Sequence, residues 1–434
     1  MRSVGVALLG LGTVGGGVAK LLLEHHDRIA RRVGLSFELR HVVVRDARKN
    51  RPASVPSEIV TTDYNRVCRD PQVEIAVELM GGVTPTRRVL MDLLQAGKDV
   101  VTANKALLAE HGPEIFDQAH TLGRSIAFEA SVGGGIPIIA AVGECLVANQ
   151  IVSITGILNG TSNYILTAMT ETGESYATAL ARAQQLGYAE ADPTLDVDGT
   201  DAAHKLAILA QLGFGSRVST AQITRHGIDR LDAVDVRYAG QLGYTIKLLA
   251  TARLTDGAIG LAVAPTLVRQ HTPLAEVRGA YNAIQVVGDA VGDTLFYGRG
   301  AGQMPTASAV VADIIDTALG RAAVTFRTLR LWTDPDVSAL PVATPQKIHG
   351  RYYLRFQVED RPGALAQLAR ALGDHKISIS SVIQPEAAED REGAAVPLIF
   401  MTHNAVDANV RAALTEIDGL TCLRLPSVCM KVEG

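Results

Sequence analysis

Residues 4–17 read VGVALLGLGTVGGG, and this stretch decides the fold of the first part of the chain. An apolar run typical of a buried strand leads directly into glycines with G-x-G-x-x-G spacing, Gly10, Gly12 and Gly15. A helix is expected to open directly after them. The first glycine permits a tight turn, the second lets a pyrophosphate approach the backbone, and the third allows close helix–strand packing. The stretch therefore predicts a dinucleotide site.

The identity of the dinucleotide depends on the end of the second predicted strand. In the predicted site, the amides of Thr13 and Val14 face the phosphates at the positive end of the helix. Asp46 is placed to accept the ribose hydroxyls of NAD, whereas Arg45 and the basic residues that follow it can accept the 2′-phosphate of NADP. This basic segment favours NADP and leaves NAD open.

Short apolar runs alternate with segments of helical spacing as far as about residue 130. The predicted strands are residues 4–10, 37–44, 73–80, 99–103 and 125–130. The predicted helices between them include residues 20–32 and 86–97. Strands that alternate with helices predict an α/β fold with a Rossmann-type, doubly wound parallel sheet.

The pattern changes after residue 131 and predicts a mixed α/β region. The predicted strands are residues 151–160 and 252–268, and the predicted buried helices are residues 201–213 and 242–252. A glycine turn and a long apolar helix are expected over 298–322.

The end of the chain predicts a separate module. Residues 333–350 are rich in proline and polar residues and predict a linker. The segments beyond it follow the order βαββαβ, which is the ferredoxin-like arrangement. Residues 1–130 are therefore the predicted dinucleotide-binding domain, with 303–325 packing back on it. Residues 131–302 are the predicted domain for catalysis and dimerisation. A linker is predicted over 333–350, and a ferredoxin-like domain over 351–434.

Composition excludes several classes of protein. The 434 residues carry 41 basic and 45 acidic side chains, and this balance argues against a nucleic-acid partner. Hydrophobic residues make up 47% of the chain, but no apolar run is long enough to cross a bilayer, so no membrane partner is expected. The four cysteines form no CxxC pair, which is typical of reduced thiols in a cytoplasmic protein.

Residues 190–205 read EADPTLDVDGTDAAHK and concentrate five carboxylates ahead of a lysine. In the closest calcium-loop register, Lys205 occupies the twelfth position, where calcium needs a glutamate. Asp201 and Lys205 are four residues apart at the start of an apolar helix and share one face. The pair is open to three interpretations: a surface ion pair, a structural partnership of Lys205 with Asp198, or a site for a cationic ligand. The buried helix favours the site.

The residue types in this stretch suit the oxidation of an amino alcohol. A dehydrogenase needs a base for the hydroxyl proton, and a lysine serves when its surroundings lower its pKa. Carboxylates such as Glu190 and Asp201 would hold an ammonium group on the substrate. Two alternatives stay open: a semialdehyde dehydrogenase, for which the apolar surroundings of Cys145 are unsuitable, and a sensor of nucleotides and amino acids.

Beyond these residues, the chain resembles homoserine dehydrogenases over essentially its full length. The matching motifs are GLGTVG (10–15), TANKALLA (102–109), EASVGGGIPII (129–139), GILNGTSNYIL (156–166), LGYAEADPTLDVDGTDAAHKLAILA (186–210), GYTIKLLA (243–250) and GRGAGQMPTASAVVAD (298–313). TRHGI (224–228) departs from the family, which more often has an acid before the Gly-Ile pair. The resemblance implies reversible NAD(P)-dependent interconversion of L-homoserine and L-aspartate 4-semialdehyde, in threonine, methionine and isoleucine biosynthesis.

The resemblance also implies roles for individual residues. It makes Lys205 the general acid/base, and it makes Glu190 and Asp201 the residues that bind and orient homoserine. The positions that match the family's residues near the cofactor are Lys105, Gly187 and Gly302. In the family, main-chain oxygens of one turn hold a monovalent cation, Na⁺, and the matching positions are Glu129, Val132, Gly134 and Ile136.

The C-terminal part resembles an ACT domain, a module that commonly binds amino acids between paired copies. Asp360 and Gly363 match the loop that contacts the effector in such domains. The pathway position implied by the resemblance suggests L-threonine as a feedback inhibitor. A module that only dimerises is the alternative, and the expected assembly is a homodimer or a homotetramer.

Overall fold

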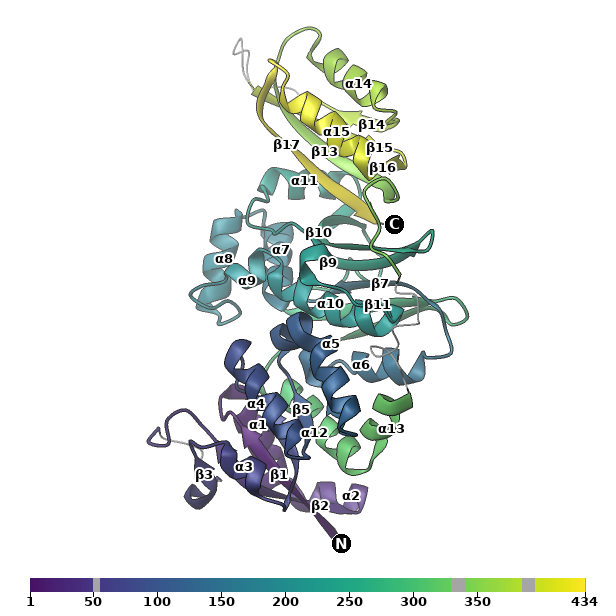
Figure 1. Cartoon of the computed structure of the whole chain (residues 1–434). Helices are drawn as coiled ribbons and strands as arrows, with labels where there is room; N and C mark the ends of the chain where they lie inside the picture. Colours follow the sequence, from purple (N-terminus) through teal and green to yellow (C-terminus); the bar gives the residue numbers. More distant parts are fainter. Residues whose placement is uncertain (50–54, 329–339, 385–394, 434) are drawn as a thin grey trace. The chain divides into compact units, whose positions relative to one another are not determined.

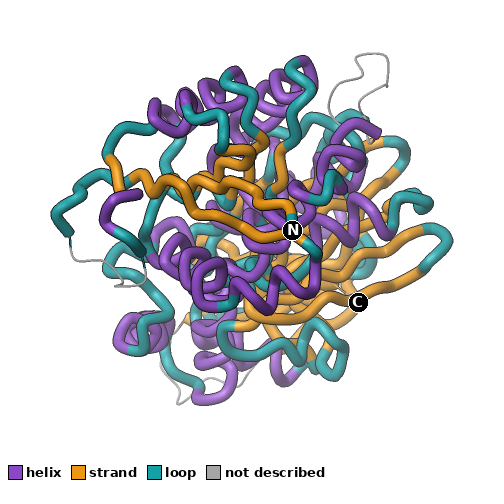
Figure 2. The backbone as a smooth tube through the Cα atoms, turned by 90° about the horizontal axis from the view of Figure 1, so that it is seen from below, coloured by secondary structure: helices purple, strands orange, loops and turns teal. Residues whose placement is uncertain are grey.

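The computed structural model describes residues 1–49, 55–328, 340–384 and 395–433 (Figure 1). The chain divides into two compact units, each assembled from three separate stretches. The first unit comprises Met1–Gly160, Asp201–Ile223 and Ala280–Leu340, and the second comprises Thr161–Thr200, Thr224–Gly279 and Pro341–Gly434. Both units contain helices and strands (Figure 2). The predicted linker lies outside the described residues over 333–339.

A six-stranded parallel sheet forms the centre of the first unit. Its strands are β1 (Arg2–Leu9), β2 (Leu35–Val43), β3 (Val60–Thr61), β4 (Val73–Glu78), β5 (Asp99–Thr102) and β6 (Ile126–Ala127). They lie in the order β3-β2-β1-β4-β5-β6, and every neighbouring pair is parallel. This is the strand order of a Rossmann fold, so the predicted doubly wound sheet is confirmed.

The helices around this sheet differ from the prediction in two places, and one strand differs in a third. They are α1 (Thr13–Glu24), α2 (His26–Val33), η1 (Ser57–Ile59), α3 (Asn65–Arg69), α4 (Thr84–Gln95), α5 (Lys105–Thr121) and η2 (Glu129–Ser131). The predicted helix over 20–32 is two helices, because the backbone leaves helical geometry at His25. The prediction omitted α5, which contains Pro113, a residue that ordinarily ends a helix. The predicted strand over 125–130 is short, because its last part forms the 3-10 turn η2.

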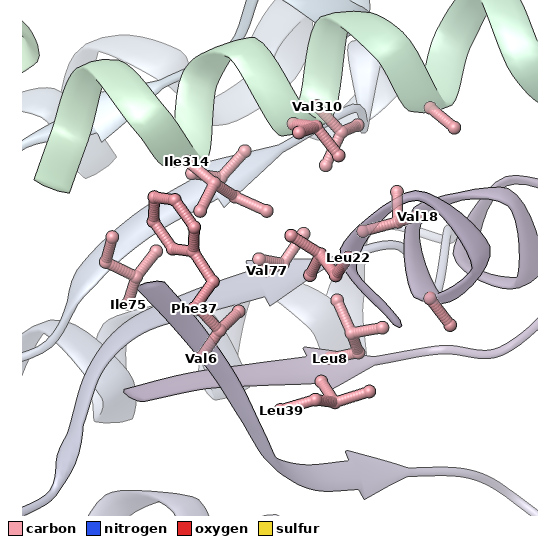
Figure 3. Close-up of a cluster of buried hydrophobic side chains, with 14 of the residues drawn as sticks. Val6, Leu8, Val18, Leu22, Phe37, Leu39, Ile75, Val77, Val310 and Ile314 are labelled. Atoms are coloured by element: carbon pink, nitrogen blue, oxygen red, sulfur yellow. The ribbon is translucent and has the colours of Figure 1, made fainter. Parts of the chain in front are cut away.

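A helix from much later in the chain completes the core of this sheet. It is α12 (Gln303–Ala318), followed by α13 (Arg321–Thr328). Figure 3 shows Val310 and Ile314 of α12 directed at side chains of α1 and of strands β1 and β2. A Cβ at Gly17 of α1 would lie only 2.9 Å from the Cβ of Ala307, so this glycine allows the two helices to approach closely.

The rest of the first unit includes a buried helix. The helix is α10 (Thr200–Phe214), of which all but three residues are buried. Strands β7 (Ile151–Ile157), β11 (Tyr281–Gly288) and β12 (Gly292–Arg299) pair in antiparallel fashion in the order β12-β11-β7. The remaining elements are the short helices α6 (Ile138–Ala140), η3 (Ala141–Cys145) and η4 (Thr220–Gln222).

In the second unit, one predicted helix proves to be a strand. Residues 242–252 were expected to form a buried helix, but they form most of β9 (Tyr244–Thr255), which pairs with β10 (Ala258–Arg269). Asp256 and Gly257 both have positive φ and close this hairpin. The other elements of this part are α7 (Gly160–Thr172), α8 (Tyr176–Gln185), α9 (Thr194–Val197), β8 (Thr224–Arg225) and α11 (Ala233–Gln241).

The end of the chain forms the predicted βαββαβ module within the second unit. Its elements are β13 (His349–Glu359), α14 (Ala364–Asp374), β14 (Ile379–Ile383), β15 (Ala395–Thr402), β16 (Ala405–Val406), α15 (Asp407–Asp418) and β17 (Leu423–Glu433). The sheet order β17-β13-β15-β14 is antiparallel and ferredoxin-like. Arg355 of β13 makes a buried two-point ion pair with Asp235 of α11, at 2.6 and 2.9 Å. No helix among the described residues is both long and apolar enough to cross a bilayer.

Candidate active site

The pair at the start of α10 is buried and lies in direct contact. Lys205 and Asp201 are each 7% exposed, and the Lys205 Nζ lies 2.8 Å from the Asp201 Oδ2. The same Nζ donates a hydrogen bond to the Leu158 carbonyl at 2.7 Å. The Asn159 amide donates to the Asp201 Oδ2 at 2.9 Å. This burial rejects the surface ion pair that four-residue spacing alone allowed.

A second lysine reaches the other oxygen of the same carboxylate. The Lys105 Nζ lies 2.9 Å from the Asp201 Oδ1, and the Lys105 side chain is 41% exposed. Asp201 therefore lies between two cations, one buried and one open to a ligand. An ammonium has three N–H donors, and two of those on Lys205 point to Asp201 and Leu158.

The position of Lys105 follows from the ends of two parallel strands. Asn104 caps the N-terminus of α5 through a bond from the Leu107 amide, and its own amide donates to the Gly82 carbonyl at 2.8 Å. The buried Glu78 carboxylate accepts from the Thr102 hydroxyl at 2.6 Å. Since both strands end at the same edge of the sheet, this network fixes the helix that begins with Lys105.

The charges around Asp201 decide its ionisation. Burial alone would raise the pKa of the Asp201 carboxyl, but Lys205 and Lys105 outweigh burial and hold that pKa well below its usual range. Asp201 is therefore ionised throughout the neutral and alkaline range. It can orient the ammonium of Lys205, and it carries the negative charge that allows a lysine to be buried.

The glycine-rich turn after β1 has the shape that a dinucleotide requires. Gly10 has a φ of 108°, and a Cβ there would lie 2.5 Å from the Leu79 carbonyl oxygen. A Cβ at Gly15 would lie 2.2 Å from the Gly10 oxygen, whereas one at Gly12 would meet nothing within 4 Å. Gly12 is the N-cap of α1, and no side chain caps this helix or places an acid in its first turn. The amides of Thr13 and Val14 follow this N-cap, as an anion site at a helix N-terminus requires.

The loop after β2 contains the residues that bear on NAD and NADP. Arg45 is exposed directly beyond the strand. The Asp46 Oδ1 accepts the backbone amide of Arg48 at 2.9 Å and lies 3.3 Å from its side-chain Nε. Asp46 thus forms a turn with a cation rather than extending alone from the strand.

The turn that carries the four predicted cation ligands packs against the loop before α12. Gly133 and Gly134 have positive φ, and a Cβ at Gly134 would lie 2.6 Å from the Gly300 carbonyl oxygen. The Glu129 carboxylate accepts the amides of Ile139 and Ala140, so it closes the turn that also contains Val132 and Ile136. Gly302, with a φ of 123°, is the N-cap of α12. No cluster of three or more His, Cys, Asp or Glu side chains suited to a metal occurs in the described part of the chain, but a main-chain oxygen site needs none.

Glu190 and Gly187 belong to the second unit, in the loop between α8 and α10. Glu190 is exposed, and Gly187 has a positive φ directly after α8. Two neighbouring acids close local turns: Asp192 accepts the Thr194 amide, and Asp198 accepts the Thr200 amide at 2.8 Å. Within this unit the Asp198 carboxylate lies 3.8 Å from the Arg225 guanidinium.

Asp360 and Gly363 line a cavity of about 460 Å³ at the end of β13. Arg361, Gln384, Val396 and Leu398 also contribute to its walls. The loop therefore places charged side chains and a glycine backbone beside apolar side chains. An amino-acid ligand would need both kinds of contact.

Two contacts of the site were not predicted, although both residues lie in the motif GILNGTSNYIL (156–166). Asn159 and the Leu158 carbonyl reach Asp201 and Lys205 from more than forty positions away. Glu78 could have been predicted as a site residue, because it is a polar residue at the end of the buried strand β4. Site residues commonly lie at the ends of strands in open parallel sheets.

The fold and the site together define a class. A Rossmann sheet with a fitted glycine turn, beside a buried lysine–carboxylate pair, is the architecture of a nicotinamide-nucleotide-dependent oxidoreductase. The chain belongs to the homoserine dehydrogenase family, which acts on CH–OH groups. The family patterns match residues 137–315 (Homoserine dehydrogenase), 10–129 (Homoserine dehydrogenase, NAD binding domain) and 352–420 (ACT domain).

Curated relatives and one solved structure match the whole chain, and a further solved structure matches about three quarters of it. Homoserine dehydrogenase from Pseudomonas aeruginosa is 43% identical and that from Bacillus subtilis 37%, each over 100% of this chain and 99% of the relative. The crystal structure of a homoserine dehydrogenase from Thiobacillus denitrificans has a TM-score of 0.92 at 42% identity, covering 100% and 99% of the two chains. A hyperthermophilic archaeal homoserine dehydrogenase in complex with NADPH has a TM-score of 0.63 at 26% identity, over 73% of this chain and 98% of that one.

Proposed function

We propose that this protein interconverts L-homoserine and L-aspartate 4-semialdehyde with a nicotinamide cofactor. The observation that carries the proposal is the buried contact of Lys205 with Asp201, within a chain of this family. A bound nicotinamide would supply the hydride acceptor for the oxidation of the carbon that carries the hydroxyl group. The protein must supply the proton transfer and the orientation of the substrate.

Lys205 is the proposed general acid/base. In the oxidation of homoserine, its neutral amine takes the hydroxyl proton as the hydride leaves, and in the reverse reaction its ammonium returns that proton. The Asp201 carboxylate and the Leu158 carbonyl fix two of the directions around the Lys205 Nζ. The third direction would face the substrate oxygen.

The other polar residues of the site serve to bind the substrate and the cofactor. Glu190 and Asp201 hold the homoserine ammonium, and Lys105, which is partly exposed, lies between the substrate and the cofactor. Gly10, Gly12 and Gly15 admit the pyrophosphate, whose charge the helix terminus at Thr13 and Val14 stabilises. Gly187 and Gly302 face the cofactor.

We favour NADP over NAD as the cofactor. Arg45 is exposed at the end of β2, where the 2′-phosphate would lie. Asp46 supports this choice, because it already accepts hydrogen bonds from Arg48. The turn at Glu129, Val132, Gly134 and Ile136 is the proposed site of a monovalent cation, with Na⁺ as the candidate.

The C-terminal module is the proposed sensor of L-threonine. Its cavity presents Asp360 and Arg361, a pair of opposite charges that suits the ammonium and carboxylate of a free amino acid. We expect a homodimer or homotetramer, and the exposed apolar side chains of Leu295 and Tyr297 on β12 support association through this strand. The free cysteines of the described residues support a reducing, cytoplasmic location.

Substitution of Lys205 by alanine tests the reaction. With homoserine and NADP at alkaline pH, we expect turnover to fall by about 10² to 10⁴, because the proton acceptor is lost. The measurement is absorbance of the reduced nicotinamide, and NADPH binding by fluorescence should be retained. Lys20→Ala, on the exposed side of α1, is the matched control and should keep parental turnover. A Lys205→Ala variant as fast as the parent, or a parent inactive with both NADP and NAD, would contradict the proposal.

A further inference from the structure

The loop that carries Glu190 is tied to the first turn of α7. Residues 161–163 of that turn, Thr161, Ser162 and Asn163, are consecutive polar residues, and all three are buried. Three buried polar side chains in a row are costly unless each has a hydrogen-bond partner. Each has one, and two of the partners lie in the Glu190 loop.

Two hydroxyl groups hold the loop on either side of Glu190. The Thr161 Oγ1 donates to the Tyr188 carbonyl at 2.7 Å, two residues before Glu190. The Ser162 Oγ donates to the Asp196 carbonyl at 2.8 Å, six residues after it. Aromatic contact reinforces the first link, since the rings of Tyr164 and Tyr188 are 4.8 Å apart.

The third polar residue holds the helix end itself in place. The Asn163 amide donates to the carbonyls of Val277 and Gly279, at 3.1 and 2.9 Å. Its oxygen accepts from the buried Lys247 at 3.2 Å. The turn is therefore a fixed support rather than a mobile helix end, and the loop is fixed relative to it.

We propose that Thr161 and Ser162 are positioning residues that hold Glu190 where it receives the substrate ammonium. The inference rests on the substrate role proposed for Glu190. Glu190 is exposed and is not placed by packing, so hydrogen bonds restrict its backbone: the Gln184 Nε2 donates to the Glu190 carbonyl at 3.2 Å, and the Thr161 and Ser162 bonds hold the loop on either side. Loss of either bond removes one hydrogen-bond donor from a carbonyl of the loop and loosens the segment that carries Glu190. Because the ammonium is bound equally in ground and transition states, the loss should raise KM and spare kcat.

Ser162→Ala and Thr161→Val are the test variants. We expect each to raise the KM for homoserine by about 10-fold while kcat and the KM for the cofactor stay near parental values. Thr161→Ser, which keeps the hydroxyl group, should restore the parental KM. Thr170→Val is the control on the same helix, because the Thr170 hydroxyl donates to the Leu166 carbonyl within α7 and, among the described residues, to nothing in the Glu190 loop.

A double mutant separates positioning from general loss of structure. In a Glu190→Gln background, Ser162→Ala should raise the KM no further, because the group that it positions is already lost. A multiplicative increase in that background, or equal losses in kcat and kcat/KM, would overturn the inference. If Glu190→Gln alone left the KM for homoserine unchanged, the substrate role of Glu190 would be overturned. If Glu190→Gln raised this KM but Ser162→Ala kept parental kinetics, only the positioning role of Ser162 would be overturned.

Discussion

At the scale of single residues, two buried lysines show opposite ways of placing a charge inside a protein. Lys205 has a carboxylate at 2.8 Å, whereas Lys247 on β9, only 2% exposed, contacts the neutral oxygens of Asn163 and Val277. Burial, helped by the nearby Arg278 cation, lowers the pKa of Lys247 to about 8, although Glu276 and Glu171 act to raise it. An uncompensated charge of this kind makes stability depend on pH.

Lys247→Met tests this dependence. In the unfolded chain the lysine pKa is 10.5, so between pH 8 and 10.5 the unfolded state binds more protons than the folded state. The unfolding free energy of the parent should therefore rise across this window relative to the variant, by about 3 kcal/mol. Below pH 8 both states are protonated and the difference should be constant. Urea unfolding at pH 7.5 and 10 measures it, with Lys20→Met as the control, and an equal difference at both pH values would reject the assignment.

The candidate site residues could be predicted where they lie close together in the sequence. Asp201 and Lys205 are one helical turn apart, and the three glycines of GLGTVG follow a strand, so their neighbours are known from the sequence. The contact of Lys105 with Asp201 joins residues 96 positions apart, and only the fold can place them together. The family resemblance supplied Lys105, and neither the resemblance nor the spacing supplied Asn159.

At the scale of elements, the close approach of α1 and α12 depends on one glycine. A Cβ at Gly17 would lie 2.9 Å from the Ala307 Cβ and 3.0 Å from the Gln303 Cγ. A Cβ at the adjacent Gly16 would have its nearest contact at 3.6 Å, an ordinary van der Waals distance. The two neighbouring glycines therefore differ in whether an added side chain fits between the helices.

Gly17→Ala and Gly16→Ala form a matched pair. Alanine favours a helix interior by roughly 1 kcal/mol over glycine, so Gly16→Ala should stabilise the protein slightly. Overpacking costs about 1–3 kcal/mol, so Gly17→Ala should have the lower unfolding free energy of the two. Thermal or urea unfolding gives the comparison, and equal stabilisation by both changes would show that α12 can move away at no cost.

Strand β9, which was predicted to be a helix, shows where hydrophobic periodicity does not distinguish the two kinds of element. The buried residues of β9 include Ile246, Leu248, Leu249 and Ala250, on both faces of the strand. A strand that is buried on both faces loses the alternation that distinguishes it from a buried helix. The β1 segment has the same continuous apolar pattern, but its glycine turn identified it as a strand.

At the scale of the whole molecule, the proposed regulation should act between separate parts of the chain. L-threonine should lower the rate of homoserine oxidation and raise the unfolding temperature, because a ligand that binds only the folded state stabilises it. At 100 times its Kd the stabilisation is about 2.7 kcal/mol. Activity assays and thermal unfolding with L-threonine, with D-threonine as the control, measure both effects. If neither quantity changed at saturating L-threonine, the module would have the dimerising role alone.

The order of the domains was predictable, but their packing was not. Composition and motif order placed a nucleotide-binding segment first and a ferredoxin-like module last, and the sheets confirm both. The division into two interleaved units has no local signal, because it depends on where distant segments bury their apolar faces. The helix over 303–318 was an exception, since its glycine turn and its apolar surface suggested that it returns to the first domain.

The return of α12 to the first sheet has a consequence for how the protein is made. The sheet is complete in sequence at Ala127, but its covering helix begins at Gln303. At the ordinary pace of a ribosome, about 5–20 residues per second, the intervening segment takes roughly 10 to 35 seconds to synthesise. Throughout this interval the apolar surface that Val310 and Ile314 later cover stays open on the nascent chain. This part of the enzyme therefore reaches its final core only late in translation, after α12 has been synthesised.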